Sequence, residues 1–128
     1  MSNTVRVGLI GTGRIGQVHA LSVANTPGAE LTIVCDMFVD SANAVAEKFG
    51  GRVVTDPAER VRFVRDRTRQ RGADVVIDGS DNFATRHAVN RACVQHAVPL
   101  VSGAVIRLDG QLTTYDTRDA TSPCYACL

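Results

Sequence analysis

The feature that most constrains the fold is a glycine-rich loop near the start of the chain, in the stretch GLIGTGRIGQVH. Gly11, Gly13 and Gly16 follow an apolar run over 5–10 and have the spacing G-x-G-x-x-G. In such a loop the glycines allow a tight turn, close approach of the backbone to a pyrophosphate, and close packing of a helix on a strand. The pattern therefore predicts a strand, a phosphate-binding loop and a helix whose N–H groups point at the phosphate.

The rest of the chain alternates short β-branched runs with longer amphipathic stretches, which predicts parallel strands joined by crossover helices. We expect strands over 5–10, 30–36, 52–55, 73–79, 99–106 and 111–116, and helices over 14–25, 40–49, 57–70 and 83–96. Asp40 is expected to cap the second helix and an Asp109-Gly110 turn to join the last two strands. In the last helix, Ala88, Ala92 and Cys93 are expected to face inward.

These elements predict a single-domain α/β fold, with a doubly wound, Rossmann-like parallel sheet in a three-layer sandwich. The expected strand order is 3-2-1-4-5-6. A length of 128 residues fits one domain, here 1–128.

Charge and hydropathy limit the classes of partner. The formal net charge is +1, which gives no overall attraction to nucleic acid or to a membrane surface, and no apolar run approaches the roughly 18 residues of a spanning helix. The expected helix over 57–71 is rich in arginine, and we interpret it as a solvated face rather than a nucleic-acid contact. Cys35 and Cys93 lie in apolar contexts where buried thiols are common, and no secretory signal pattern is seen, so we expect a cytoplasmic protein.

An acidic residue completes the pattern of a dinucleotide site. Asp36 lies twenty residues beyond Gly16, at the end of the expected second strand. A carboxylate there accepts hydrogen bonds from the adenosine ribose and repels a 2′-phosphate, which favours NAD over NADP. The alternatives are a purely structural glycine turn and an Asp36 that caps the turn after it. The residues expected to bind the dinucleotide are Gly11, Thr12, Gly13, Arg14, Ile15, Gly16 and Asp36.

The first part of the chain carries a family resemblance. Through VRVGLIGTGRIGQVHA, PGAELTIVCD and DSANAVAEKFG, residues 5–55 resemble the nucleotide-binding half of the glucose-fructose oxidoreductase and inositol dehydrogenase family. The resemblance implies an NAD site. That family has a Thr-Pro motif after the fourth strand and a Glu-Lys-Pro motif after the fifth, where this chain has DGSDN and PLVSGAVI. The only lysine, Lys48, lies on the expected second helix, so the family's catalytic set is incomplete.

The last part resembles a different family. Through DNFATR and SPCYACL, residues 74–128 resemble the ubiquitin-activating-like adenylyltransferases of the molybdopterin and thiamine pathways. The resemblance implies that Asp81 helps to hold magnesium and ATP, with Asn82, Thr85 and Arg86 around it, and we place Ser80 beside Asp81 in the nucleotide site. It also implies that Cys124 and Cys127 form half of a zinc site. The groups with which that family's N-terminal region reaches the ATP phosphates are replaced here by the dehydrogenase-like segment.

Three functions stay open at this point. The first is an NAD(H)-binding domain without a complete catalytic apparatus, in an engineered chimera of dehydrogenase-like (1–55), connecting (56–73) and adenylyltransferase-like (74–128) segments. The second is an ATP-dependent adenylyltransferase that uses Asp81, and the third is a scaffold that binds no nucleotide. Zinc is expected only if a second chain, in a symmetric homodimer, completes the half-site. His19 is expected to pack or to face solvent, and Asp78 or Asp81 is expected to cap the last helix.

Overall fold

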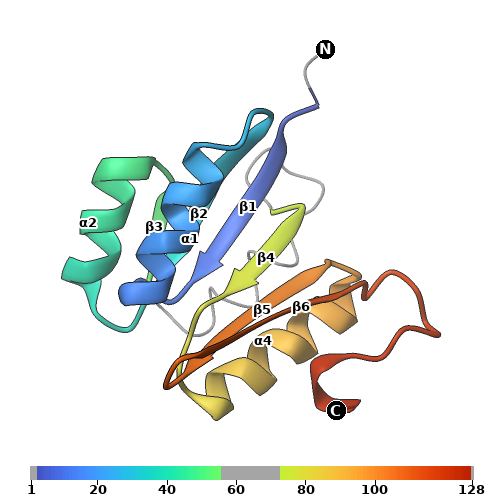
Figure 1. Cartoon of the computed structure of the whole chain (residues 1–128). Helices are drawn as coiled ribbons and strands as arrows, with labels where there is room; N and C mark the ends of the chain where they lie inside the picture. Colours follow the sequence, from blue (N-terminus) through green and yellow to red (C-terminus); the bar gives the residue numbers. More distant parts are fainter. Residues whose placement is uncertain (1–2, 56–72, 128) are drawn as a thin grey trace.

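The computed structural model describes residues 3–55 and 73–127. They form a six-stranded sheet in the order β3-β2-β1-β4-β5-β6, as the sequence predicts. In chain order the elements are β1 (Val5–Ile10), α1 (Arg14–Ala24), β2 (Ala29–Cys35), α2 (Val39–Phe49), β3 (Arg52–Val54), β4 (Val75–Asp78), α4 (Phe83–His96), β5 (Leu100–Ile106), β6 (Asp109–Tyr115) and the 3-10 turn η1 (Tyr125–Cys127). The fold is the expected Rossmann-like α/β sandwich (Figure 1).

The register of the sheet brings the carboxyl ends of its parallel strands to one edge. Ile10 at the end of β1 pairs with Cys35 on β2 and with Asp78 on β4. Strands β1 to β5 are parallel, whereas β6 runs antiparallel to β5. Because the chain proceeds from β1 to β2 and β3 on one side and returns to β4 on the other, the order reverses between β1 and β4. A doubly wound sheet binds ligands outside the strand ends at such a reversal.

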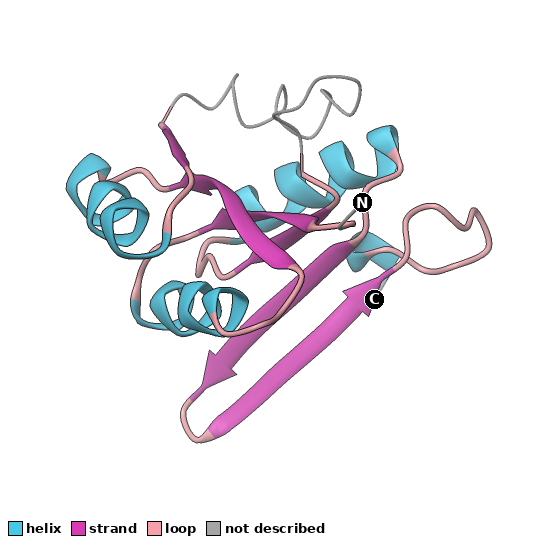
Figure 2. Ribbon diagram, turned by 90° about the horizontal axis from the view of Figure 1, so that it is seen from above, coloured by secondary structure: helices cyan, strands magenta, loops and turns pink. Residues whose placement is uncertain are grey.

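Apolar side chains cover both faces of the sheet, which explains the three layers. Helices α1 and α2 pack on one face, where Leu9 and Val34 are completely buried. Helix α4 packs on the opposite face, against a cluster that includes Ile33 and Leu100. Figure 2 shows helices on both sides of the strands, with the β5–β6 hairpin reaching beyond the other strands. Strands buried on both faces are typical of parallel sheets.

Helix α4 begins and ends where the sequence predicts, but its cap and its inner face differ from the prediction. The N-cap is Asn82, whose side chain accepts a hydrogen bond from the Thr85 backbone, so the expectation that Asp78 or Asp81 caps this helix is wrong. Ala88 is exposed, and the buried residues of the helix are Arg86, Val89, Asn90, Ala92 and Cys93. The inner face includes two polar residues because each has hydrogen-bond partners there.

Two further local predictions are wrong. Helix α2 begins at Val39 with the backbone of Phe38 at the N-cap, so Asp40 lies in the first turn and does not cap it. The β5–β6 turn consists of Arg107 and Leu108, because Ile106 pairs with Asp109 and extends both strands past the expected Asp109-Gly110 turn. Arg107 adopts φ +57° in this two-residue turn, as tight hairpin turns require.

Other expectations fall partly outside the described residues. The helix expected over 57–70, with its Asp56 cap and its arginines, lies outside them. Within 3–55 and 73–127, no helix has the length and the apolar composition needed to cross a membrane. Cys35 and Cys93 are buried as expected, and Cys124 and Cys127 carry free thiols.

Candidate functional site

A cavity of about 370 Å³ lies at the edge where β1, β2 and β4 end. This volume is within the usual range for small-molecule sites, roughly 300–1,000 Å³. Three segments supply its walls: the glycine loop with the start of α1, the turn after β2, and the loop between β4 and α4. The lining residues are Ile10, Gly11, Gly13, Arg14, Ile15, Cys35, Asp36, Met37, Phe38, Ser41, Gly79, Ser80, Asp81, Asn82 and Thr85.

The three loop glycines occupy three different environments. Gly11 has φ +89°, and a Cβ there would lie 2.9 Å from the carbonyl carbon of Gly79. A Cβ on Gly16 would lie 2.0 Å from the Gly11 carbonyl oxygen, so α1 can rest this closely on the loop only without a side chain. A Cβ on Gly13 would meet nothing within 4 Å. Two glycines therefore build the loop, and the third leaves open space beside the cavity.

At the N-terminus of α1, the open space beside Gly13 is bordered by backbone N–H groups that no side chain caps. Gly13 is the N-cap, and no side chain caps the helix. The first N–H groups of a helix have no partner within it, and they carry a partial positive charge that favours an anion. Arg14, exposed at the first helical position, adds a full positive charge at the same wall.

Thr12 connects the glycine loop to Asp36. The Thr12 backbone N–H and hydroxyl both donate to Asp36 Oδ2, at 2.7 and 2.8 Å. The Thr12 hydroxyl also lies 2.7 Å from the hydroxyl of Ser41, which donates to the Thr12 carbonyl oxygen. Thr12 is fully buried and does not line the cavity. Its side chain therefore holds Asp36 in place, whereas the sequence reasoning grouped Thr12 with the residues that contact pyrophosphate.

Asp36 is a preorganised carboxylate at the cavity wall. Burial by itself would raise the pKa of Asp36, but hydrogen bonds from the backbone of Phe38 and from Thr12 outweigh this effect and lower the pKa below its usual value. Asp36 is therefore ionised at neutral pH. Thr12 donates twice to Oδ2 and the Phe38 N–H donates to Oδ1, and the Met37 backbone also donates to this carboxylate. Asp36 is one of the residues that line the cavity.

The opposite wall is the loop after β4, where the sequence placed Ser80 and Asp81. Asp78 at the end of β4 is buried and accepts a hydrogen bond from the Ser80 backbone at 2.9 Å. The Ser80 hydroxyl is buried without a partner among the described residues. Asp81 is exposed at the mouth of the cavity. The structure thus brings the two halves of the predicted site to one cavity.

A buried arginine fixes the position of this second wall. Arg86 on α4 is 8% exposed, and its guanidinium donates to the Ser102 hydroxyl at 2.9 Å, to the Gly103 carbonyl at 2.7 Å and to the Ser80 carbonyl. These bonds join the loop after β4 to strand β5. Arg86 therefore shapes the cavity from behind the wall and does not line it.

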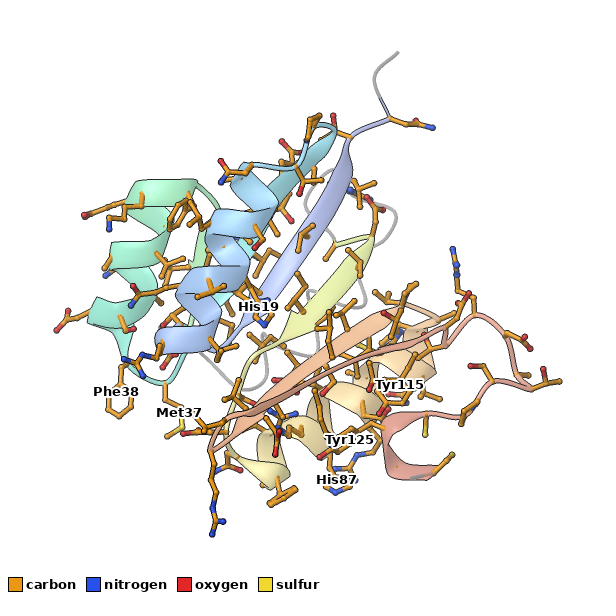
Figure 3. The ribbon with its side chains drawn as sticks, in the orientation of Figure 1. His19, Met37, Phe38, His87, Tyr115 and Tyr125 are labelled. Carbon is orange, nitrogen blue, oxygen red and sulfur yellow. The ribbon has the colours of Figure 1, made fainter. Side chains whose placement is uncertain are left out.

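Sequence reasoning missed two apolar residues at the cavity. Met37 and Phe38 line it, yet they are 71% and 74% exposed. Figure 3 shows both side chains at the turn that precedes α2. An exposed aromatic side chain beside an ionised acid offers a flat apolar surface to a ring-shaped ligand. No periodic pattern marks these residues, because they lie in a turn.

His19 lies behind the glycine loop. An ideal Cβ on Gly103 would lie 2.9 Å from His19 Nε2, and one on Gly79 would lie 3.4 Å from the ring carbon Cδ2. The imidazole thus packs on two glycines of β5 and of the loop after β4 (Figure 3). Burial lowers the pKa of His19, so the ring is neutral at neutral pH.

Cys124 and Cys127 form a separate site near the end of the described chain. Their sulfur atoms are 3.3 Å apart. Hydrogen bonds from Asn90 and from Cys127 lower the pKa of the Cys124 thiol. No group of three or more histidine, cysteine, aspartate or glutamate side chains suited to a metal ion occurs in the described parts of the chain. The pair thus supplies two of the four ligands that a structural zinc site needs.

Comparison with known proteins places most of the chain in one family. The model of the ThiF family matches residues 41–128. The chain belongs to the ThiF family. A similar curated protein is the adenylyltransferase and sulfurtransferase MOCS3 of Drosophila grimshawi, which is 53% identical over 57 residues, or 44% of this chain. That stretch is only 12% of the length of the relative.

Two solved structures that resemble this ThiF-family chain are inositol dehydrogenases. A myo-inositol dehydrogenase from Corynebacterium glutamicum has a TM-score of 0.66 and 33% identity, covering 77% of this chain and 27% of the dehydrogenase. A Lactobacillus casei myo-inositol dehydrogenase, solved with NAD(H) and myo-inositol, has a TM-score of 0.65 and 24% identity over 77% of this chain and 28% of its own. Both resemblances noted in the sequence are therefore confirmed.

The glycine environments predict losses of stability of different size for the same substitution at two glycines. Gly16→Ala should lower the free energy of unfolding by about 1–3 kcal/mol or more, because the new methyl group overlaps the Gly11 carbonyl. Gly13→Ala should cost at most about 1 kcal/mol, since only the N-cap preference changes. Chemical denaturation of both variants and of the wild type measures the difference. Equal losses of unfolding free energy in the two variants would show that Gly16 does not lie this close to the Gly11 carbonyl oxygen.

Metal content tests the incomplete thiolate set. Because the described residues supply two zinc ligands, we expect a purified sample to contain no more than one zinc per two chains, held by Cys124 and Cys127 of both chains of a dimer. Elemental analysis combined with light scattering measures the metal content and the mass. One zinc per chain in a monomer contradicts this expectation.

Proposed function

We propose that the cavity binds NAD(H), and that the chain is a dinucleotide-binding domain without a complete catalytic apparatus. The observation that carries the proposal is the pairing of an open, uncapped α1 N-terminus at Gly13 with an ionised Asp36 across one cavity. The first group suits a pyrophosphate and the second suits a ribose. These two groups are therefore arranged to bind two parts of the same ligand.

The fit of the dinucleotide follows the walls of the cavity. The backbone of Gly11 and Gly13 and the Arg14 side chain would contact the pyrophosphate, and the Asp36 carboxylate would accept from an adenosine ribose hydroxyl. Met37 and Phe38 offer an apolar surface for the adenine ring. Ser80 and Asp81 lie on the opposite wall, where they would face the nicotinamide half of the ligand. When bound, the nicotinamide would supply hydride chemistry, but neither family's full catalytic set is present in the sequence.

The family match favours a second candidate, an ATP-dependent adenylyltransferase. The matched region contains Asp81, Asn82, Thr85 and Arg86. Asp81 is exposed at the cavity mouth, where its carboxylate would reach a magnesium ion on the ATP phosphates. Lys48, the only lysine, lies on α2 and does not line the cavity. Arg14 is thus the only basic side chain among the described residues that line the cavity. An adenylation transition state would need more charged groups than this, which is why NAD(H) ranks first.

We further propose that the chain is an engineered chimera of the two families. The support is the contrast between a ThiF-family match over residues 41–128 and structural neighbours that are inositol dehydrogenases. The two halves meet in one sheet whose strand ends share one edge. We propose a cytoplasmic location, a homodimer, and no nucleic-acid or membrane partner.

Nucleotide preference separates the two candidates. NADH should bind more tightly than ATP, because the glycine loop and Asp36 are both present whereas the phosphate-binding groups of an adenylyltransferase are not. Parallel calorimetric titrations with NADH, and with ATP in the presence and absence of magnesium, measure the preference. Tighter, magnesium-dependent ATP binding that disappears in Asp81→Ala would instead establish the second candidate. Binding of neither nucleotide would favour a scaffold.

The role of Asp36 predicts a change in cofactor preference. A charge-assisted hydrogen bond contributes about 1.5–3 kcal/mol, so Asp36→Ala should weaken NAD binding about tenfold to a hundredfold. NADP binding should weaken much less or improve, since a repulsion of the 2′-phosphate is removed. Binding titrations with both cofactors measure the ratio.

A matched control separates this role from a general loss of charge or stability. Asp40→Ala removes an exposed acid from the first turn of α2 that does not line the cavity, so it should leave both affinities unchanged. Melting curves of both variants measure stability, and only Asp36→Ala should be destabilised by the loss of the Thr12 bonds. An unchanged NAD-to-NADP ratio in Asp36→Ala would mean that Asp36 only stabilises the turn.

A further inference from the structure

Strand β6 is an open edge of the sheet. Among the described residues it pairs with β5 alone, and Figure 2 shows it on the outer side of the hairpin, away from the helices. Every residue from Asp109 to Thr114 is exposed. An edge strand of this kind presents a row of backbone N–H and C=O groups that can pair with another strand.

The register of the hairpin determines which of these backbone groups are free. Hydrogen bonds alternate along an antiparallel pair, and the residues that flank a two-residue turn bond to each other. Here the flanking residues are Ile106 and Asp109. Counted in twos from Asp109, the residues of β6 direct their backbone groups toward β5. The backbone groups of the residues between them, Gly110, Leu112 and Thr114, therefore point outward.

The features that usually block an edge strand do not occur along β6. Natural edges are protected by charged side chains, by proline or by bulges. The stretch from Gly110 to Tyr115 contains neither a charged residue nor a proline, and its pairing with β5 continues without interruption. This edge is thus suited to accept a further strand.

An apolar side chain lies at the middle of the open edge. Leu112 is 68% exposed, because its partner on β5 is Gly103, which has no side chain to cover it. An ideal Cβ on Gly103 would lie 3.8 Å from Leu112 Cδ1 and 2.9 Å from His19 Nε2. Leu112 therefore lies on the α1 side of the hairpin, where a second strand would cover it.

We propose that a second copy of this chain covers this edge, through antiparallel pairing of β6 with β6 about a two-fold axis at Leu112. The inference rests on the homodimer proposed above and gives it a contact surface. The axis sets Leu112 opposite its own copy and Gly110 opposite the partner's Thr114. Each of these pairs can exchange two N–H···O bonds. Only an axis at Leu112 pairs all three outward-facing residues of one copy with those of the other.

The charges at the two ends of β6 agree with this register. Leu108 in the hairpin turn of one copy falls opposite the partner's Asp116, which brings Arg107 near that acid. Asp109 falls opposite the partner's uncharged Tyr115. The register thus sets no two like charges opposite each other. Because each copy contributes a single strand, the contact is small, and we expect a dissociation constant of about 10–100 µM.

Charge exchange at position 112 tests both the edge and the register. Sedimentation velocity of chelator-treated protein over a range of concentrations measures the dissociation constant without zinc between the chains. Leu112→Lys should raise this constant about tenfold or more, because two ammonium groups then face each other and the leucine contact is lost. Leu112→Glu should have the same effect. An equal mixture of the two variants should recover the wild-type association, because opposite charges then face each other across the axis.

Val105→Lys is the matched control. Val105 is 53% exposed on the same side of the hairpin, but it lies on β5, one strand away from the edge. Its replacement should change the dissociation constant by no more than about twofold, and circular dichroism checks that each variant is folded. Amide exchange locates the contact: the Leu112 and Thr114 amides should exchange more slowly in concentrated than in dilute samples. The amides of Gln111 and Thr113, which face β5, should change little.

Four outcomes would overturn the proposal. The wild type could stay monomeric at all concentrations, the two lysine variants could weaken the dimer equally, or the mixture of oppositely charged variants could fail to associate. The fourth is a dimer that forms only with zinc and is lost when Cys124 and Cys127 are both replaced by serine. That result would support the homodimer and contradict this interface.

Discussion

The close approach of Gly16 to the Gly11 carbonyl is the contact on which the rest of the site depends. It sets α1 directly on the loop after β1 and so aims the first N–H groups of the helix at the edge where β1 and β4 end. The Thr12 hydrogen bonds to Asp36 then tie this loop to the end of β2. One wall of the cavity is thus determined by backbone contact, which a side chain at position 16 would prevent.

The general fold and the glycine wall could be predicted from the sequence because both depend on short-range patterns. Strand order follows from alternating β-branched and amphipathic segments, and the loop follows from glycine spacing. Asp36 could be found because it directly follows strand β2, at a fixed distance in sequence from the glycine loop. The sequence could not predict that Thr12 does not line the cavity. The direction of its side chain depends on hydrogen bonds with Asp36 and Ser41, which are distant in sequence.

The predictions that failed concern choices between neighbouring residues that only tertiary contacts decide. Asn82 caps α4 instead of Asp81 because the backbone there places its amide at the Thr85 N–H. Arg86 faces inward because Ser102 and two carbonyls accept its hydrogen bonds, and helical spacing alone would not place a charged residue there. Met37 and Phe38 are exposed residues of a turn, and a turn has no hydrophobic periodicity from which burial or function could be predicted.

The shared edge of the parallel strands has a consequence for how such a domain can change in evolution or in the laboratory. The β1–β2 half delivers its loops to the same edge as the β4–β5 half, and the two halves join along the β1–β4 pairing. Recombination at this seam keeps the cavity while it replaces one of its walls. Because each half supplies its own walls, ligand preference depends on both halves together.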